Sequence, residues 1–494
     1  MNPIQQFNEA NNCFYLDFTG GTFNESIGVT FSDNSVYKAK SNGVSNAVKN
    51  ATTIFPATID GRITNSASGY SRIFCNKSQV TGISIDLGIS GAGGAIDYRN
   101  INLDASFMKQ FPKLKKFYFK HYAYSRNEPY LNGKVTGDWA ENLPTDLEIL
   151  NLEAIDYPNS NATFDINNIS AGSKLKEVVF ANFTSTVLNS YLTVNGDLSK
   201  IPASCNKLML GGDRTSAGTN NVTGAIPAWV EEFSRIGRNN INQNLSTLNP
   251  YIRHLSLEGS NVLSGSIPST WYNSLKYLRV LGNNIISGTI PSMSLCTNIY
   301  VAGKNELSGS IPSLPICTSF FVQGNNSLSG EIKNDENLPL VIDIDISGLN
   351  EVSGTIESSS KLETVTISGN NTISGLGLLP KCVRFSVSGK NFITGNPFQY
   401  LPMAKSISIT GLNKINNYVS KNFPADMSLI NISGRAALTQ SMVDQLLSDL
   451  ANTTWVGTKR ITIKGLCEAP SQLGLSMIQK LLLERGVTSV SVNS

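Results

Sequence analysis

The most constraining feature of this chain is a short phrase that recurs along its middle. Copies read LEGSNVLSGSIP from Leu257, VLGNNIISGTIP from Val280 and VAGKNELSGSIP from Val301. The glycine of each Ser/Thr-Gly pair falls at Gly265, Gly288, Gly309, Gly330, Gly354, Gly375 and Gly395, at intervals of 23, 21, 21, 24, 21 and 20 residues. A period of about 21 residues is typical of stacked repeats, in which each coil contacts only its neighbours. Such a chain is expected to act through a long surface.

One repeat predicts one coil of the stack. Leu278 and Val280 alternate around Arg279, which indicates a short strand with two inward side chains and one outward side chain. The glycine that follows, such as Gly282, permits a positive φ where the coil turns. An asparagine two residues later is expected to be buried and to satisfy backbone groups. These asparagines form a predicted ladder: Asn261, Asn284, Asn305, Asn326, Asn350, Asn371 and Asn391. The Ser-Gly pairs are expected to be turn residues.

The phrase resembles the plant-type leucine-rich repeat, L-x-L-x-x-N-x-L-S-G-x-I-P, with one additional residue before the asparagine. The resemblance extends from about residue 205 to about residue 435. It implies a β-rich α/β repeat fold, a leucine-rich-repeat solenoid with a parallel β-sheet.

The remaining sequence divides the chain into three parts. Residues 1–100 hold short β-like runs and predict a β-rich N-terminal module or cap, with docking to another protein as the alternative. Residues 101–435 form the solenoid. Residues 436–494 predict two helix–strand units that cap it: a helix that begins after Thr439, a strand at 461–463, a helix near 475–485 that ends at Gly486, and a last strand at 487–492.

A second resemblance lies in this C-terminal part. The segments ALTQSMVDQLLSDL, ITIKG, EAPSQLG and LLLERGVTSVSV are similar to a terminal unit of tailed-phage tail proteins and of surface proteins of gut bacteria. The resemblance implies a phage virion or a bacterial surface as the place where the chain acts.

Four cysteines occupy a core position. Cys205, Cys296, Cys317 and Cys382 each lie three residues before the first apolar residue of a strand, where neighbouring repeats have leucine. Buried thiols are therefore expected, because a free cysteine behaves as a small apolar residue. A disulfide between Cys296 and Cys317 is the alternative.

Composition and charge exclude several classes of partner. The net charge is +3 and only 15% of residues are charged, so there is no basic field for nucleic acid. No apolar run approaches about 18 residues, so no membrane insertion is expected. The first residues, MNPIQQFNEANNCFYLDF, lack the basic and apolar regions of a secretory signal, and none is expected.

Catalytic and cofactor motifs are missing from the sequence. No P-loop, dinucleotide-binding glycine pattern, paired zinc cysteines or HExxH occurs, and no metal or cofactor is expected. Asp343 and Asp345 point outward from one strand, but a hard cation wants six or more oxygens, so a solvated acidic strand is expected rather than a calcium site. A polysaccharide-acting solenoid enzyme is the remaining enzymatic alternative, since two carboxylates can meet in space.

Candidate binding residues are the outward ones at strand centres. In order these are Ser256, Arg279, Tyr300, Phe321, Asp345, Thr366 and Ser386. Tyr300 and Phe321 are expected to be adjacent, flanked by Arg279 and Asp345, and neighbouring aromatics on a solenoid face mark interaction surfaces. Contact with a ligand or host surface and an assembly interface within a multi-copy or homo-oligomeric structure both remain open.

The resulting hypothesis is a non-enzymatic interaction protein of a phage virion, in or near the tail. Its expected partners are other virion proteins and a bacterial surface glycan or protein. A bacterial surface adhesin is the alternative, with localisation at the cell surface.

Overall fold

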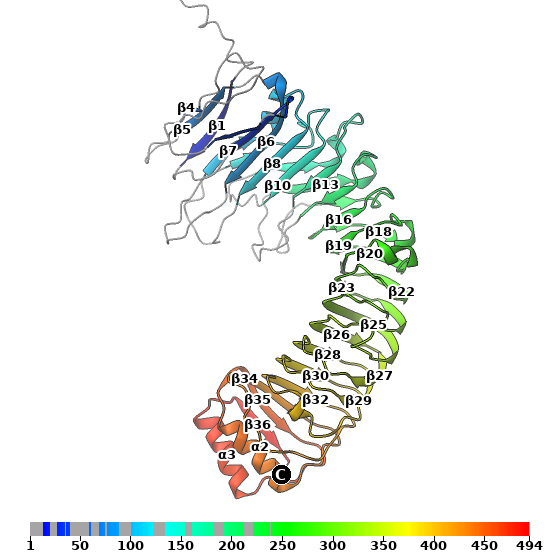
Figure 1. The fold of residues 1–494 in the computed structure, drawn as a ribbon, viewed down its shortest axis with the longest axis vertical. Helices are drawn as coiled ribbons and strands as arrows, with labels where there is room; N and C mark the ends of the chain where they lie inside the picture. Colours follow the sequence, from blue (N-terminus) through cyan, green and yellow to red (C-terminus); the bar gives the residue numbers. More distant parts are fainter. Residues whose placement is uncertain are drawn as a thin grey trace, which may run out of the picture. The chain divides into compact units, whose positions relative to one another are not determined.

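The computed structural model of the chain is a pair of stacked-strand units (Figure 1). It describes residues 13–19, 27–34, 36–39, 59–60, 69–74, 77–87, 100–121, 134–153, 161–180, 192–211, 221–237 and 239–493. One unit holds Met1–Gln243 and Ser256–Asn261, and the other holds Asn244–Leu255 and Val262–Ser494. Each unit is a leucine-rich-repeat solenoid of stacked, mostly parallel strands, which confirms the expected fold class.

The first unit begins with antiparallel strands and continues with parallel ones. Its strands are β1 (Cys13–Thr19), β2 (Ile27–Phe31), β3 (Val36–Ala39), β4 (Ile59–Asp60), β5 (Gly69–Phe74), β6 (Val80–Leu87), β7 (Asn100–Asp104), β8 (Lys116–His121), β9 (Lys134–Thr136), β10 (Ile149–Glu153), β11 (Thr163–Asp165), β12 (Glu177–Val179), β13 (Thr193–Asp197), β14 (Lys207–Met209), β15 (Val222–Thr223), β16 (Glu232–Arg235) and β17 (Asn239–Asn240). β1 pairs antiparallel with β5 and β7, and β2 with β3 and β6. From β6 onward, β8, β10, β12, β14 and β16 are parallel. The parallel sheet therefore starts at β6, inside the predicted N-terminal module of residues 1–100.

Five of the 3-10 helices in the described part of the chain begin with the same aspartate or asparagine cap. Each directly follows a short strand, or in the last case nearly so: η3 (Ala105–Gln110), η4 (Ile166–Asn168), η5 (Leu198–Lys200), η6 (Leu245–Thr247) and η8 (Pro397–Tyr400). Asp197, for example, accepts a hydrogen bond from the Ser199 backbone N–H at 2.8 Å, while Leu198 is buried. Side-chain oxygens at this position satisfy an N–H group that the short helix leaves unpaired.

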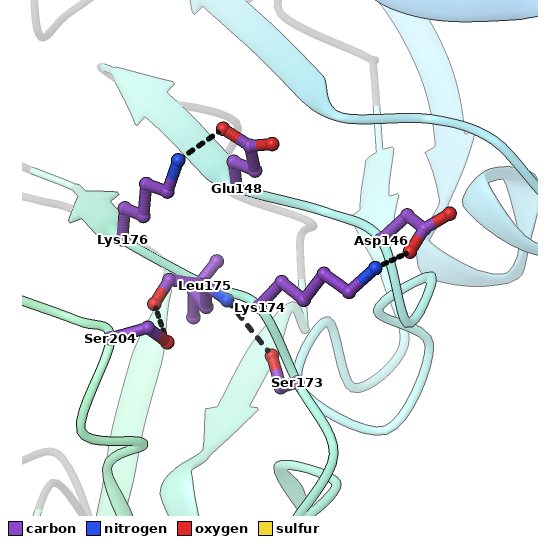
Figure 2. Close-up of polar contacts among 7 residues, drawn as sticks. All are labelled: Asp146, Glu148, Ser173, Lys174, Leu175, Lys176 and Ser204. Carbon is purple, nitrogen blue, oxygen red and sulfur yellow. Dashed lines mark hydrogen bonds and ion pairs between the residues drawn. The ribbon is translucent and has the colours of Figure 1, made fainter.

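Ion pairs join successive coils of the first unit near the start of its strands (Figure 2). Lys174 Nζ lies 2.6 Å from Asp146 Oδ1, and Lys176 Nζ lies 2.8 Å from Glu148 Oε2. The Lys174 ammonium lowers the pKa of the Asp146 carboxyl, through a hydrogen bond first and charge second. Because these groups are exposed and screened by water, they favour the register of neighbouring coils and add little stability.

The main sheet of the second unit is parallel and in register. It contains β21 (Tyr277–Leu281), β23 (Asn298–Val301), β25 (Ser319–Glu331), β26 (Asp343–Gly348), β28 (Thr364–Ile367), β30 (Arg384–Val387), β32 (Ser406–Ile409), β34 (Met427–Ile432), β35 (Trp455–Ile463) and β36 (Ser489–Val492). Strands β18 (Asn242–Asn244) and β19 (His254–Glu258) contribute residues to both units. Alternate side chains such as Leu278 and Val280 are fully buried, so the core lies behind this sheet and the intervening residues point outward.

A second parallel sheet covers another side of the same coils. It contains β20 (Val262–Ser266), β22 (Ile285–Thr289), β24 (Glu306–Ser310), the end of β25, β27 (Glu351–Ile356) and β29 (Thr372–Leu376); β31 (Thr394–Gly395) and β33 (Lys414–Ile415) pair with each other. The expectation that the Ser-Gly pairs are turn residues is wrong, because they lie in these strands. The apolar residue before each pair, such as Leu263 or Ile286, is fully buried and anchors the strand to the core.

Between the two sheets, a glycine and an asparagine close each coil. Gly303 has φ +147°, and a Cβ atom there would lie 2.6 Å from the Gly282 carbonyl oxygen of the preceding coil. Two residues later, Asn305 is fully buried and its Oδ1 accepts a hydrogen bond from the Ile286 N–H at 3.1 Å. Each ladder asparagine from Asn284 to Asn391 thus joins its coil to the preceding second-sheet strand.

The C-terminal part continues the main sheet with helices in the connections. Helix α2 (Gln440–Ala451) begins after Thr439, whose Oγ1 accepts from the Met442 N–H at 3.4 Å. Helix α3 (Gln472–Leu483) begins earlier than expected because Ser471 caps it, accepting from the Leu473 N–H at 3.1 Å. β34, β35 and β36 pair in parallel, so the sheet extends through the last described strand. The remaining short helices are η2 (Lys77–Gln79) and η7 (Ser269–Asn273).

Candidate binding surface

The outward face of the main sheet in the second unit carries the residues that the sequence singled out. Arg279 pairs with Tyr300, Tyr300 with Phe321, and Phe321 with Asp345. These residues come from β21, β23, β25 and β26, which pair in that order in the main sheet; Figure 1 labels the last three. Alternation on in-register strands therefore places all four side chains in one outward row.

Tyr300 and Phe321 form the centre of this row. Their ring centroids are 4.5 Å apart and their planes differ by 15°, a stacked arrangement. The Arg279 guanidinium carbon lies 5.5 Å from the Tyr300 ring centroid, on the preceding strand. All three side chains are half-buried. Because the rings stack on each other, a ligand that approaches the sheet from outside meets ring edges and the Tyr300 hydroxyl.

The acidic end of the row lies on β26. Asp345 is half-buried, and Gln323 Nε2 donates a hydrogen bond to its Oδ2 at 2.7 Å. Burial raises the pKa of the Asp345 carboxyl, and the hydrogen bond from Gln323 only partly opposes this. Asp343 lies two residues earlier on the same face of the strand. The structure thus brings both predicted acidic residues to the aromatic pair.

A second stacked pair adjoins this row, and sequence reasoning missed it. The rings of His254 and Tyr277 are 4.6 Å apart with an interplanar angle of 5°. Tyr277 lies two residues before Arg279 on β21, so both point outward. The alternation of inward and outward residues contains this information, because His254 and Tyr277 each directly precede a buried leucine. The prediction of binding residues covered only the outward residue at the centre of each strand.

We name this surface the sheet-face patch and define it as His254, Tyr277, Arg279, Tyr300, Phe321, Gln323, Asp343 and Asp345. Beyond it, the central outward row changes character. The following residues in the row are Thr366, Ser386 and Ser408, which are small and uncharged. Large and charged side chains are therefore concentrated at the patch rather than distributed along the central row.

The predicted thiols and ladder residues lie in the interior of the coils. Cys205, Cys296, Cys317 and Cys382 are free and fully buried. Burial raises the pKa of Cys205, Cys296 and Cys382 to about 12 and that of Cys317 to about 11. Each thiol donates to a backbone carbonyl two residues ahead, as Cys317 does to Ser319 O at 3.3 Å. The predicted ladder asparagines are likewise fully buried.

Within the described ranges, no group of three or more histidine, cysteine, aspartate and glutamate side chains is arranged to hold a metal ion. Neither α2 nor α3, the α-helices of the described part, has the length and apolar character of a membrane-spanning helix.

Comparison with known proteins identifies similar folds only. No family model matches the sequence, and no curated protein is significantly similar to it. Among solved structures, the chain is similar to PEPR1 bound to AtPEP1, with 16% identity, a TM-score of 0.46, and coverage of 72% of this chain and 53% of that chain. The leucine-rich-repeat ectodomain of the Arabidopsis receptor kinase HAESA, in complex with an extended IDA peptide hormone, is similar with 18% identity, a TM-score of 0.42, and coverage of 64% and 56%. A plant ice-binding protein is similar with 19% identity, a TM-score of 0.32, and coverage of 40% and 71%. The chain spans about half the length of the first two of these structures.

Proposed function

We propose that this chain is a non-enzymatic interaction protein that binds a protein ligand through the sheet-face patch. The observation that carries this proposal is the stacked Tyr300–Phe321 pair on the outward face, with Arg279 beside it. Tyrosine, tryptophan and arginine supply a large share of the energy of protein interfaces. Stacking across the strands stabilises the pair, and a partner that covers the half-exposed rings buries their remaining apolar surface.

The packing of the rings favours a protein over a sugar as the ligand. Sugar recognition by aromatic residues uses the open face of a ring. Here the facing surfaces of Tyr300 and Phe321 cover each other, Arg279 lies over Tyr300, and the remaining face of Phe321 is directed along the sheet toward the strand of Asp345. A sugar ring that approaches from outside the sheet therefore meets ring edges rather than a ring face. Ring edges, a hydroxyl and charged groups suit the mixed side chains of a polypeptide, which pack as aromatic contacts and hydrogen bonds.

The proposed setting is a phage virion, in or near the tail, where the patch contacts a bacterial surface protein or another virion protein. The uncharged polar composition and the C-terminal resemblance to phage tail proteins support it. A bacterial surface adhesin is the second setting, supported by the same resemblance. Mass spectrometry of purified virions and of envelope fractions separates the two: peptides of this chain in virions support the first, and peptides only in the envelope overturn it.

The binding function is tested with fluorescently labelled full-length protein on cells of the bacterial host. Three forms are compared: the unaltered chain, Tyr300→Ala/Phe321→Ala, and the matched control Ser386→Ala/Ser408→Ala on the same face. The proposal predicts a loss of at least about tenfold in binding for the aromatic variant only, since two central interface residues are removed. Protease treatment of the cells should abolish binding, and periodate treatment should not.

Two results would contradict the proposal, and a third would decide between its two classes of protein partner. Equal binding of the aromatic variant and the unaltered chain removes the patch from the interface. Loss of binding after periodate alone makes the ligand a glycan. Binding only to isolated virion proteins, and not to cells, makes the patch an assembly interface.

A further inference from the structure

We propose that the sheet-face patch recognises a basic side chain, lysine or arginine, of its protein ligand, and that this group docks on Asp343 and Asp345 beside Phe321. The inference rests on the proposed function and names the chemistry of the partner. It starts from two carboxylates that share one face of β26, separated by two residues and therefore by roughly 7 Å.

These two carboxylates have no cation beside them. Among the described residues, no lysine, arginine or histidine nitrogen lies within ion-pair distance of Asp343 or Asp345. Glu331 and Glu336, earlier in the chain, both lie near Lys333. Asp345 is half-buried, and its hydrogen-bonding side-chain partner, Gln323, is neutral. A partly desolvated carboxylate with only a neutral partner is unfavourable, and a cation from a ligand relieves that cost.

The shape around Asp345 fits an organic cation. Asp345 lies between Phe321 on one neighbouring strand and Thr366 on the other. Aspartate and threonine are much shorter than phenylalanine, so a group above Asp345 is bordered on one side by the Phe321 ring. The opposite face of that ring is covered by Tyr300. A cation at this point meets a carboxylate below and an aromatic face beside it, a combination that attracts ammonium and guanidinium groups.

The Arg279 end of the sheet-face patch disfavours a basic side chain. Arg279 lies three strands from Asp345, or roughly 14 Å at the spacing of strands in a sheet. Its positive charge repels a second cation there. The basic side chain of the ligand is therefore favoured at the Asp343–Asp345 end, which orients the ligand on the sheet.

A basic side chain fits this site better than a metal ion does. A hard cation such as Ca²⁺ takes six to eight oxygen ligands at short distances. The face around Asp345 offers two carboxylates on one strand and the hydroxyl of Thr366, with no third acidic group close enough to complete a cluster within the described ranges. An ammonium or guanidinium group needs only the carboxylates and the ring.

The test is selection of a displayed library of random twelve-residue peptides on the full-length protein. Selections run in parallel on the unaltered chain, on Asp343→Asn/Asp345→Asn and on the control Glu306→Gln/Glu351→Gln, which removes the same net charge from exposed positions off the sheet face. Asparagine keeps the size of aspartate and an oxygen for Gln323, so the fold is retained, and circular dichroism checks this. We expect lysine or arginine at one position of the peptides selected on the unaltered chain and on the control. Peptides from these two selections should bind the asparagine variant at least about tenfold more weakly, because a close charge pair is lost.

The outcomes separate this inference from the proposed function. Peptides that need Tyr300 and Phe321 but carry no preferred basic residue, or bind the asparagine variant equally well, overturn the inference and leave the function standing. If no selected peptide loses binding to Tyr300→Ala/Phe321→Ala, the proposed function itself fails. If peptide binding depends on added Ca²⁺ and not on a basic residue, a metal ion rather than a basic side chain occupies the site, which also overturns the inference.

Discussion

The ring of Tyr300 stacks on the ring of Phe321, with centroids 4.5 Å apart and an angle of 15° between the planes. The two residues are one repeat apart in the sequence, and the stack of coils brings them together at about the spacing of strands in a sheet. Their backbones are fixed by the parallel sheet, so little conformational freedom is lost when a ligand binds. The same coil-to-coil contacts that stabilise the solenoid therefore also prepare its outward surface.

Replacing a ladder asparagine should destabilise the second unit. Asn326 is fully buried and its Oδ1 accepts from the Leu307 N–H at 3.1 Å. Asn326→Ala leaves that buried N–H without a partner, which costs about 1–3 kcal/mol. The change is measured by urea denaturation followed by circular dichroism. Asn325→Ala, at the neighbouring exposed position, is the control and should change stability by less than about 0.5 kcal/mol. Equal effects of the two substitutions would contradict the stabilising role of the ladder asparagines.

Glycine substitutions should rank according to backbone conformation and space. Gly303→Ala combines φ +147° with a Cβ atom 2.6 Å from the Gly282 oxygen, so it should lower the denaturation midpoint most. Gly395 has φ +77° and open space, so alanine there should have a smaller effect. Gly172 has neither constraint, and Gly172→Ala should be close to neutral. Any other order would show that coil spacing does not govern these positions.

The buried thiols should resist alkylation in the folded protein. Burial raises the pKa of Cys382 to about 12, and its Sγ donates to Arg384 O at 3.2 Å. At about pH 8 the thiol is therefore protonated and shielded, and iodoacetamide reacts with the thiolate. Mass spectrometry should find Cys382 unlabelled in the native protein and labelled in guanidinium chloride. Labelling at the same rate in both conditions would contradict the burial of this position.

Asparagine at position 345 should stabilise the fold at neutral pH. Burial raises the pKa of Asp345, so the folded state holds the proton more tightly than the unfolded state. The stability from this group is present below the unfolded pKa and is lost as pH rises through the folded pKa. Asp345→Asn should therefore raise the denaturation midpoint at about pH 7 and leave it unchanged at about pH 3. A lower midpoint at neutral pH would mean that the carboxylate supports the fold.

How much of this structure the sequence predicts depends on the kind of contact. Strand positions in the main sheet followed from alternation, as for Leu278 and Val280, because a two-residue period has only one buried face. The second sheet was missed, since glycines such as Gly288 read as turns although they lie inside strands. No local pattern distinguishes a glycine that ends a strand from one with φ +78° within it.

The binding surface was predictable in part for the same reason. The row from Arg279 to Asp345 followed from the repeat length, because each outward centre residue meets its counterpart one coil away. The pairing of Gln323 with Asp345 depends on side-chain conformation across β25 and β26, and repeat spacing does not contain that information. The stack of His254 on Tyr277 is predictable only if the first outward residue of each strand is compared between coils, as well as the outward residue at the strand centre.

The most direct test of the account is photo-crosslinking from defined positions of the full-length protein on host cells. A photoreactive residue is placed at Thr366, next to the patch, and in a second protein at Ser308, on the other sheet. The account predicts crosslinks to a cell-surface protein from Thr366 and none from Ser308, and it predicts that Tyr300→Ala/Phe321→Ala abolishes those from Thr366. Crosslinks from Ser308, or crosslinks from Thr366 that survive the loss of both rings, would show that ligand binding does not depend on the sheet-face patch.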